Sequence, residues 1–322
     1  MNKIKIGIVG YGNLGKGLIS AINNTDDMEL VKIFTRRNPK DFNIKEIESL
    51  DNILEYKDII HVLVLSLGSA IDIPIFAPKL AKDFNTVDCY DNHSNMLNYY
   101  KIMDKIAREN NNTSMIAMGW DPGLFSLNRF MAESILPKGK SFTFWGPGLS
   151  QGHSDALRRI EGIKLAVQYT IPKKEILNNI SNQPDNLETC DTHDRQCFVV
   201  LEKNYNKNDI TEEIIHMKDY FEDYNTEVNF ISEEEFKQNH QSMPHGGHII
   251  RIGETGKDHK ENIKFSLKLA SNPEFTASVA LAGARAVYKM NQLRNYGSIT
   301  ILDTPAQFYS PFSLEELIDE YL

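Results

Sequence analysis

Short apolar runs rich in β-branched residues alternate with amphipathic runs over the first 121 residues. The pattern predicts strands at 4–9, 30–34, 59–67, 86–89 and 114–118, and helices at 14–23, 74–82 and 94–109. Strands that alternate with helices indicate a parallel sheet that is covered on both faces. A Gly-Trp-Asp-Pro-Gly run at 119–123 ends this pattern, so we expect residues 1–121 to form a doubly wound α/β domain.

The second half of the chain carries strand patterns with few helical patterns between them. We expect strands at 142–145, 165–170, 197–201, 226–231, 248–252 and 261–269. In the last of these, apolar and polar residues alternate, which is typical of a strand with one buried and one wet face. Successive strands without intervening helices predict a mainly antiparallel sheet, and therefore an α+β domain over 122–272. The polar stretch 178–194 is predicted to be a loop.

Two helical patterns close the sequence. The first, at 273–290, is rich in alanine, and the second is a short one at 314–321. We expect residues 273–322 to form a C-terminal helical segment that packs back toward the first domain.

Composition narrows the class of protein. Of the 322 residues, 41% are hydrophobic and 25% are charged, which is ordinary for a globular chain. The net charge of −9 argues against a nucleic-acid or anionic-membrane partner. The longest apolar run, 59–67, is too short to span a bilayer. Three cysteines without a CxxC pair, behind an N-terminus that resembles a first strand more than a signal peptide, predict a cytoplasmic protein.

A glycine fingerprint lies between the first predicted strand and helix. The residues are Gly10, Tyr11, Gly12, Asn13, Leu14 and Gly15, which form a GxGxxG motif. In a Rossmann-type domain these glycines allow a tight turn, the approach of a diphosphate and close packing of helix on strand. The helix N-terminus then offers N–H donors to the phosphates. The alternative is a plain turn that merely needs glycine, which this context makes the weaker interpretation.

The end of the second strand indicates which dinucleotide binds. A site for NAD usually carries an acid there, whereas this chain has Thr35, Arg36 and Arg37. Two guanidinium groups suit a 2′-phosphate, so the sequence favours NADP(H) over a solvated basic turn. Small residues after the third strand, Ser66, Leu67, Gly68 and Ser69, lie where a cofactor crosses the sheet, although an ordinary turn explains them equally well.

Two acids follow the next two strands directly. Asp91 comes after the strand at 86–89, and Asp121 after the strand at 114–118. Both are expected on the cofactor side of the sheet, where they could hold an ammonium group or activate a water molecule. Turn chemistry explains either acid alone, because aspartate favours turns. The pair in equivalent places favours a functional site.

The second half carries a glycine-rich run at 144–155 that could offer backbone N–H groups to a carboxylate. His245 and His248 form no closed metal site, and Cys190 with His193 is a poor ligand set, so we expect no metal. A serine hydrolase is excluded because the sequence has no GxSxG motif.

Several stretches together resemble the meso-diaminopimelate dehydrogenase family. They are Tyr11 to Gly15, Tyr90 to His93, Gly119 to Gly123, Phe144 to Arg159, His193 to Phe198, Met243 to His248, and Asn272-Pro273. The resemblance covers nearly the whole chain, and the run FWGPGLSQGHSDALRRI is far more specific than three spaced glycines. It implies a homodimeric, NADP-dependent enzyme of bacterial lysine and cell-wall precursor synthesis. Such an enzyme oxidises the D-centre of meso-2,6-diaminopimelate to L-2-amino-6-oxopimelate, which cyclises to tetrahydrodipicolinate, with release of ammonia.

The resemblance also implies site residues. Substrate binding and dimerisation fall to the second domain, and the cofactor adds the strand ends Cys89, Tyr90, Asp91, Met118, Gly119, Trp120, Asp121 and Pro122 to the residues above. The D-centre would lie by Asp91, Asp121, Trp145, Gln151 and Gly152, with both acids catalytic. The distal L-centre would be held by Thr170, Arg195, His245 and Asn272.

Two other functions fit parts of the sequence. A sugar dehydrogenase of the glucose–fructose oxidoreductase type shares the two-domain layout. Enzymes of that type carry a Glu-Lys-Pro sequence where this chain has Cys89-Tyr90-Asp91-Asn92, so the absence of the lysine counts against this function. An NADP(H)-sensing protein without catalysis would leave the paired acids and Arg195 with His245 unexplained.

Overall fold

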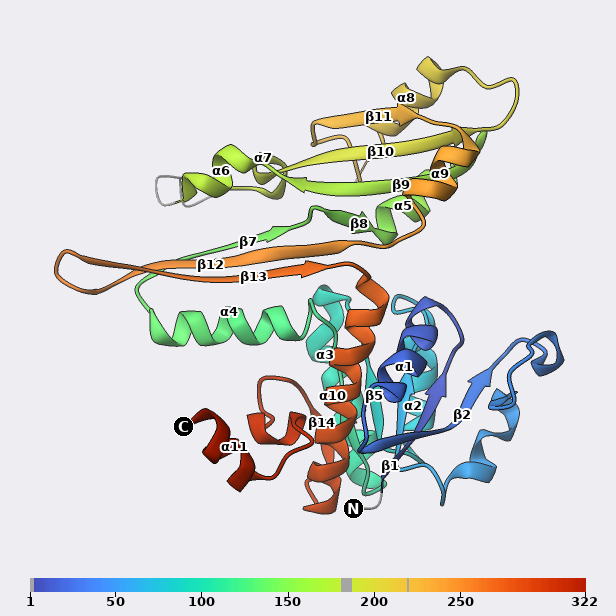
Figure 1. Cartoon of the computed structure of the whole chain (residues 1–322), viewed down its shortest axis with the longest axis vertical. Helices are drawn as coiled ribbons and strands as arrows, with labels where there is room; N and C mark the ends of the chain where they lie inside the picture. The colour runs from blue at the N-terminus through green and yellow to red at the C-terminus, as the bar shows by residue number, and fades with distance from the viewer. Residues whose placement is uncertain (1–2, 181–186, 219) are drawn as a thin grey trace. The chain divides into compact units, whose positions relative to one another are not determined.

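The computed structural model describes residues 3–180, 187–218 and 220–322 (Figure 1). The chain divides into two compact units. The first unit combines Met1–Phe130 with Pro273–Leu322, and the second unit is Met131–Asn272. The two units share no sheet: the first is built on one sheet and the second on two.

The first unit is built on a parallel sheet. Its strands are β1 (Ile4–Val9), β2 (Met28–Thr35), β3 (Ile47–Ser49), β4 (Val62–Leu65), β5 (Thr86–Asp88), β6 (Thr113–Met115) and β14 (Gly297–Ile299). Their order across the sheet is β14-β6-β5-β4-β1-β2-β3, with every neighbouring pair parallel. The strand order reverses between β1 and β4, which is the switch point where open α/β sheets bind ligands.

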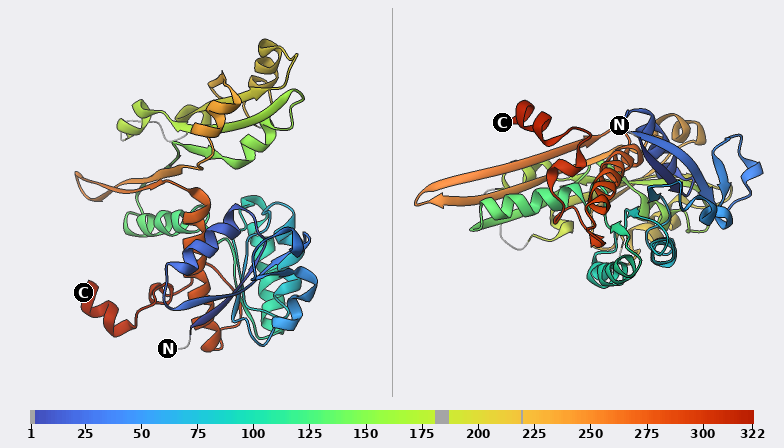
Figure 2. Two further views of the ribbon diagram at one scale, coloured as in Figure 1. Left: turned by 45° about the vertical axis from the view of Figure 1, so that its right-hand side comes forward. Right: turned by 90° about the horizontal axis from the view of Figure 1, so that it is seen from below.

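Helices cover both faces of this sheet, as the left view of Figure 2 shows. They are α1 (Asn13–Asn23), α2 (Asp72–Leu80), α3 (Met96–Glu109) and α10 (Asn272–Gln292). The last helix, α11 (Leu314–Tyr321), has no buried residue and does not contribute to this cover. Residues of α1 and α10 share one apolar cluster with Ile6 and Ile8 of β1. Residues of α2 and α3 share a second cluster with Val9, Leu63 and Leu65. The alternation of β1 and β4 side chains between these clusters gives the sheet two buried faces.

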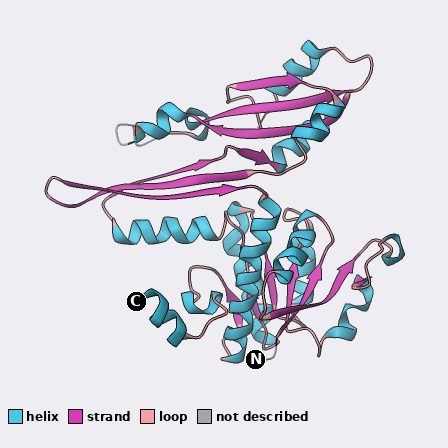
Figure 3. Ribbon diagram, viewed as in Figure 1, coloured by secondary structure: helices cyan, strands magenta, loops and turns pink. Residues whose placement is uncertain are grey.

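The second unit contains two smaller sheets (Figure 3). One joins β7 (Gly139–Trp145), β12 (His245–Gly256) and β13 (His259–Leu269), all antiparallel. The other joins β8 (Gly148–Ser150), β9 (Ile163–Pro172), β10 (His193–Leu201) and β11 (Thr226–Phe230). The helices are α5 (Gln151–Leu157), α6 (Lys174–Asn178), α7 (Thr189–Thr192), α8 (Lys207–Ile215) and α9 (Glu233–Asn239).

The predicted fold class is confirmed in both units, with differences in individual elements. The strand expected at 59–67 is shorter, because it runs only where Val62–Leu65 pair with β1. The pair β10 and β11 is parallel and is an exception to the mainly antiparallel expectation. Its strands are linked through α8, whose apolar Ile210 and Ile214, four residues apart, are buried against the sheet.

The prediction of a loop over 178–194 is wrong for the C-terminal part of this stretch. Residues 181–186 lie outside the described part of the chain. From Thr189 the chain forms α7, which begins with a capping box between Glu188 and Asp191. Strand β10 then starts at His193, so Arg195 lies inside a strand. The polar side chains that indicated a loop are those that cap α7 and alternate along β10.

The glycine-rich turn at 119–123 belongs to the first unit, which extends to Phe130 instead of ending at Asp121. The turn folds back on itself, since the N–H of Gly119 donates to the oxygen of Pro122 and the N–H of Leu124 to the oxygen of Gly119. It leads directly into α4 (Leu124–Ile135), a helix that the sequence pattern did not predict.

No helix within the described ranges is long and apolar enough to cross a membrane.

Arg251 of β12 closes the end of α4. Its side chain is 4% exposed and donates to the main-chain oxygens of Leu136 and Pro137 and to the hydroxyl of Ser141. The last carbonyl groups of a helix have no partner within the helix, and a cation is favourable at that end. Arg251 therefore stabilises the junction between α4 and β7.

We expect Arg251→Met to lower the free energy of unfolding by about 2–3 kcal/mol, because buried carbonyl groups would lose charged donors. Urea unfolding measures the change. Lys260→Met, at an exposed position of β13, is the matched control and should change the stability by less than about 0.5 kcal/mol. Equal stability of the two variants would contradict the role of Arg251.

Candidate functional site

The glycine fingerprint forms the turn between β1 and α1. Gly10 has a φ of +107°, and a Cβ there would lie 2.7 Å from the main-chain oxygen of Ser66. A Cβ on Gly15 would lie 2.4 Å from the oxygen of Gly10, whereas a Cβ on Gly12 would meet no atom within 4 Å. Gly10 and Gly15 thus permit close packing, and Gly12 leaves the start of α1 open. This arrangement fits a dinucleotide diphosphate, which needs backbone approach and helix N–H groups.

A cavity of about 240 Å³ lies beside this turn. It is lined by residues of the glycine turn and of the ends of β2 and β4: Val9, Gly10, Tyr11, Gly12, Phe34, Thr35, Arg36, Arg37, Leu50, Ser66, Leu67, Gly68 and Asp72. The structure therefore brings together predicted cofactor residues of the glycine turn and of the ends of β2 and β4, whereas the predicted residues at the ends of β5 and β6 are not part of this lining. Asn13, Leu14 and Ser69 adjoin this lining in the sequence without being part of it.

Both arginines of the basic pair are held in place at the cavity. Arg36 donates to both carboxylate oxygens of Asp72 at 2.9 and 2.8 Å, and its guanidinium lies 5.3 Å from the centre of the Phe76 ring. Arg37 donates to the oxygen of Tyr11 at 2.7 Å and lies 4.7 Å from the centre of the Phe42 ring. The Arg36 side chain is 52% exposed, and such a pair contributes at most about 1 kcal/mol. Arg36 can therefore exchange the carboxylate for a phosphate.

Three further residues of the predicted site, Ser66, Ser69 and Asp91, lie just after the ends of β4 and β5. The Ser66 hydroxyl lies within hydrogen-bonding distance of the oxygens of Val9 and Gly10, which joins the β4 end to the glycine turn. The Ser69 hydroxyl donates to the Asp91 carboxylate at 2.5 Å and accepts from the Asp91 N–H at 3.0 Å. Asp91 is thus fixed by a neutral hydroxyl on the next strand end.

Asp121 forms an ion pair with Arg129 of α4, with oxygen–nitrogen distances of 2.5 and 3.2 Å. Its side chain is 6% exposed. The carboxylate is therefore held in one orientation by a planar, two-donor partner. Asp91 and Asp121 differ in this respect, since one faces a hydroxyl and the other a guanidinium.

The second unit aligns predicted residues across its four-stranded sheet. Gly148 of β8 lies opposite Thr170 of β9, and Thr170 lies opposite Arg195 of β10. A Cβ on Gly148 would lie 2.5 Å from the Cα of His245, so His245 packs directly against the backbone of β8. The N–H of Asn272 donates to the oxygen of Met243 at 2.7 Å. Strand register thus brings Thr170, Arg195 and His245 into one neighbourhood.

Arg195 is a buried cation with an unusual set of partners. It is 6% exposed, donates to the Thr170 hydroxyl at 2.6 Å, and lies 3.9 Å from the centre of the Tyr224 ring. Its Nε has no hydrogen-bond partner, and no carboxylate within the described ranges forms an ion pair with it. Burial lowers the pKa of Arg195, since the charged form loses water. The site can accept an anion.

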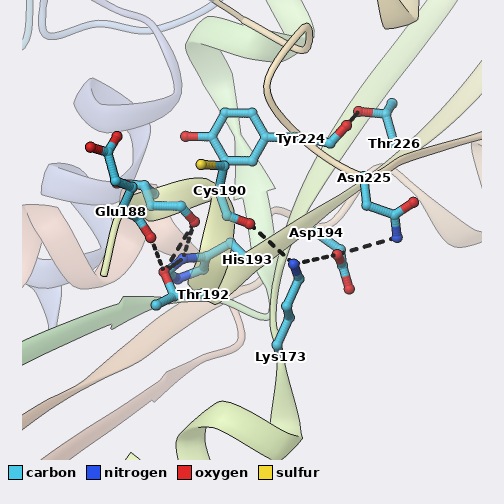
Figure 4. Close-up of polar contacts among 10 residues, drawn as sticks. Lys173, Glu188, Cys190, Thr192, His193, Asp194, Tyr224, Asn225 and Thr226 are labelled. Atoms are coloured by element: carbon cyan, nitrogen blue, oxygen red, sulfur yellow. Dashed lines mark hydrogen bonds and ion pairs between the residues drawn. The ribbon is translucent and has the colours of Figure 1, made fainter. Parts of the chain in front are cut away.

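Trp145, at the end of β7, is held by a buried histidine. The main-chain N–H of Trp145 donates to Nε2 of His193 at 2.9 Å. Figure 4 shows His193 beside Thr192, whose hydroxyl lies 2.7 Å from its Nδ1. Burial lowers the pKa of His193 to about 4, so the ring is neutral at pH 7 and Nε2 stays an acceptor. This contact fixes the backbone of Trp145 to the start of β10.

Two other predicted residues lie at the start of α5. A Cβ on Gly152 would meet no atom within 4 Å, so its backbone is open. The side chain of Gln151 lies outside what the structure describes. Across the described ranges, no group of three or more histidine, cysteine, aspartate or glutamate residues could hold a metal.

Sequence reasoning missed four partners of the predicted residues: Asp72, Arg129, His193 in its contact with Trp145, and Tyr224. Asp72 follows the Ser66–Ser69 run closely and was visible as an acid opening a helix. Arg129 required the unpredicted helix α4. Tyr224 required the tertiary arrangement, because it precedes β11 and reaches Arg195 only through strand pairing.

Comparison with known proteins agrees with this geometry. A model of the diaminopimelic acid dehydrogenase C-terminal domain matches residues 119–271. A meso-diaminopimelate D-dehydrogenase of Ureibacillus thermosphaericus is 49% identical over 326 residues, covering 100% of both chains.

Two solved structures are similar over the whole length. One is a mutant meso-diaminopimelate dehydrogenase of Clostridium tetani E88 with DAP, at 47% identity and a TM-score of 0.94, covering 99% of this chain and 100% of that one. The other is an engineered D-amino acid dehydrogenase bound to NADP+, at 40% identity and a TM-score of 0.88, covering 100% of each chain. The resemblance noted in the sequence is confirmed, and this chain belongs to the meso-diaminopimelate D-dehydrogenase family.

Proposed function

We propose that this chain catalyses the reversible NADP-dependent oxidative deamination of the D-centre of meso-2,6-diaminopimelate. The products are L-2-amino-6-oxopimelate, which cyclises to tetrahydrodipicolinate, and ammonia with NADPH. The observation that carries this proposal is the buried Arg195, which has a hydroxyl and an aromatic ring beside it but no ion-pair partner within the described ranges. A buried charge is unfavourable until it is paired, so a substrate carboxylate completes the site.

The cofactor of the proposed reaction is NADP(H). The open start of α1 at Gly12 and the basic pair at the end of β2 support it, because they suit a diphosphate and a 2′-phosphate respectively. When bound, the nicotinamide accepts hydride from the substrate carbon. The chain's own residues position the substrate amine and the water that follows.

Asp91 and Asp121 carry the proposed polar chemistry. They orient the amine of the D-centre, and one of them assists the addition of water to the oxidised carbon. Their fixed carboxylates support this role, since Ser69 holds Asp91 and Arg129 holds Asp121. The proposed contacts to the D-centre also include Trp145, Gln151 and Gly152, and those to the distal L-centre include Thr170, His245 and Asn272.

We further propose a cytoplasmic homodimer in which the second unit carries the substrate site and the dimer contact. Two large apolar side chains in the part of α4 that belongs to the second unit are exposed, namely Met131 and Ile135, at 47% and 60%. A cluster of this kind supports an interaction surface.

Replacing Arg36 and Arg37 by alanine should weaken NADP+ binding by roughly 10- to 100-fold for each charged hydrogen bond lost to the 2′-phosphate. Binding of NAD+, which lacks that phosphate, should change far less. Dissociation constants for both nucleotides measure the effect. Lys40→Ala removes the same charge from an exposed position near the end of β2 and should leave both constants unchanged. Equal weakening of the two nucleotides by the arginine variants would contradict the assignment.

Asp121→Asn should lower kcat with meso-diaminopimelate by roughly 10²–10⁴-fold, the range for a positioned acid or base. The NADP+ dissociation constant should be little changed, which separates chemistry from cofactor binding. Asp51→Asn, at an exposed position in the first unit, is the control and should turn over normally. Wild-type turnover in Asp121→Asn would remove that residue from the mechanism.

Arg195→Met should nearly abolish activity on meso-diaminopimelate while NADP+ affinity and folding persist. The distal carboxylate would lose its two-donor partner, so the substrate could no longer be held in one direction. Arg159→Met is the control, since the Arg159 side chain is 78% exposed.

The stereoisomers of the substrate test the same arrangement. The L,L isomer lacks a D-centre and the D,D isomer misplaces the distal group, so both should be poor substrates. Similar turnover of all three isomers, or normal activity in Arg195→Met, would refute two-ended recognition.

A further inference from the structure

Asp88, the last residue of β5, is a charged residue in an apolar setting. It is fully buried, with 0% exposure. Val87 before it and Leu65 opposite it on β4 are equally buried. It is not one of the residues that the proposed reaction uses. Burying an acid costs free energy that an apolar residue of similar size would not cost, so its presence here indicates a specific role.

The hydrogen bonds of Asp88 run to two different strand ends. Its Oδ1 accepts the N–H of Tyr90 at 3.0 Å and the N–H of Ala117 at 3.2 Å. Its main-chain oxygen accepts the N–H of Met118 at 2.8 Å. The thiol of Cys89 adds a link to the oxygen of Met118 at 3.3 Å. One residue therefore ties the end of β5 to the end of β6.

These two ends lead directly to the acids of the site. Asp91 follows Tyr90, and Asp121 comes three residues after Met118. Ala117, directly before Met118, has a φ of +56°, a left-handed conformation that is unfavourable for a residue with a Cβ. The bond from its N–H to Asp88 holds this turn, which sets the direction in which the chain leaves β6.

We propose that Asp88 is a positioning residue, whose buried carboxylate fixes the two backbone segments that carry Asp91 and Asp121. The inference rests on the proposed function, because it assumes that those two acids act on the substrate. The Asp88 carboxylate also accepts a bond from the Tyr99 hydroxyl of α3 at 2.6 Å, at its other oxygen, and this bond involves neither of the two backbone segments.

The titration of Asp88 supports the proposal. Burial raises the pKa of Asp88 to about 6, although its bonds from Tyr99, Tyr90 and Ala117 act in the other direction. The titratable groups that face it are Tyr99 on α3 and Cys89 and Tyr90 on its own strand end. Since the folded pKa lies above the value of 3.8 for a free side chain, stability is present below about pH 4 and is lost as the pH rises through about 6. At neutral pH the ionised form is retained against stability, which is expected of a functional group.

Three variants test the proposal by kinetics. Asp88→Asn keeps the shape but weakens the acceptor for both N–H groups, so kcat should fall roughly tenfold or more. Asp88→Ala removes the acceptor, and misplacement of the acids should lower kcat roughly 10²-fold. Tyr99→Phe is the matched control, since it removes a bond to the same carboxylate but leaves both backbone bonds. Its kcat should stay near the wild-type value.

Stability separates positioning from ordinary packing. Asp88→Asn should unfold at the same urea concentration as the wild type or higher at about pH 8, and its advantage should shrink at about pH 5, where the wild-type carboxyl gains a proton. A purely structural role predicts instead that Asp88→Asn is less stable at both pH values. Loss of turnover without loss of stability supports the proposal.

Amide hydrogen exchange gives a test that needs no activity. The N–H groups of Tyr90 and Ala117 should exchange faster in Asp88→Asn and Asp88→Ala than in Tyr99→Phe. Wild-type kcat in Asp88→Asn, unchanged exchange, or a kcat loss in Tyr99→Phe equal to that of Asp88→Asn would each overturn the proposal. If the wild type itself does not turn over meso-diaminopimelate, the proposed function fails, while the exchange result still decides whether Asp88 fixes the two segments.

Discussion

The cofactor half of the site depends on one close approach, between the ends of β1 and β4. The main-chain oxygen of Ser66 lies so near Gly10 that any Cβ there would be 2.7 Å from it, and the Ser66 hydroxyl lies within hydrogen-bonding distance of the oxygen of Gly10. With the two strand ends pressed together, α1 starts directly above the switch point of the sheet, with its first turn facing the cavity. Bulk at Gly10 or Gly15 would displace α1, and the cavity would lose its phosphate end.

The two units use charge in opposite ways. In the first unit, the Asp121 carboxylate has its own guanidinium, so its charge is balanced within the protein. In the second unit, Arg195 is buried with a hydroxyl and an aromatic ring. A balanced pair holds a group in place, whereas an unbalanced buried cation selects an anion from outside. The first arrangement suits residues that orient a reacting centre, and the second suits recognition of the end that does not react.

How well a feature could be predicted from the sequence depends on how far apart along the chain the residues that form it lie. The glycine turn, the strand ends with their acids and the basic pair were predictable, because each is a short run beside a predicted strand. The setting of Arg195 was not, since β9 and β10 must pair in register before Thr170 meets it, and Tyr224 arrives from another segment. Polar residues around α7 indicated a loop because a capped one-turn helix and a polar strand edge have the same composition. Substrate identity came from family resemblance and not from such patterns.

The first unit is made from two stretches of chain that synthesis delivers far apart in time. The ribosome completes Met131–Asn272 before α10 and β14 emerge. Until then, β6 lacks its edge partner, and the sheet face that holds Ile6 and Ile8 lacks the apolar side of α10. The second unit can therefore fold while the nucleotide-binding sheet is still open, in reverse of the usual N-terminal-first order. Nascent chains interrupted in this interval would expose a wide apolar surface, which makes them substrates for chaperones and proteases.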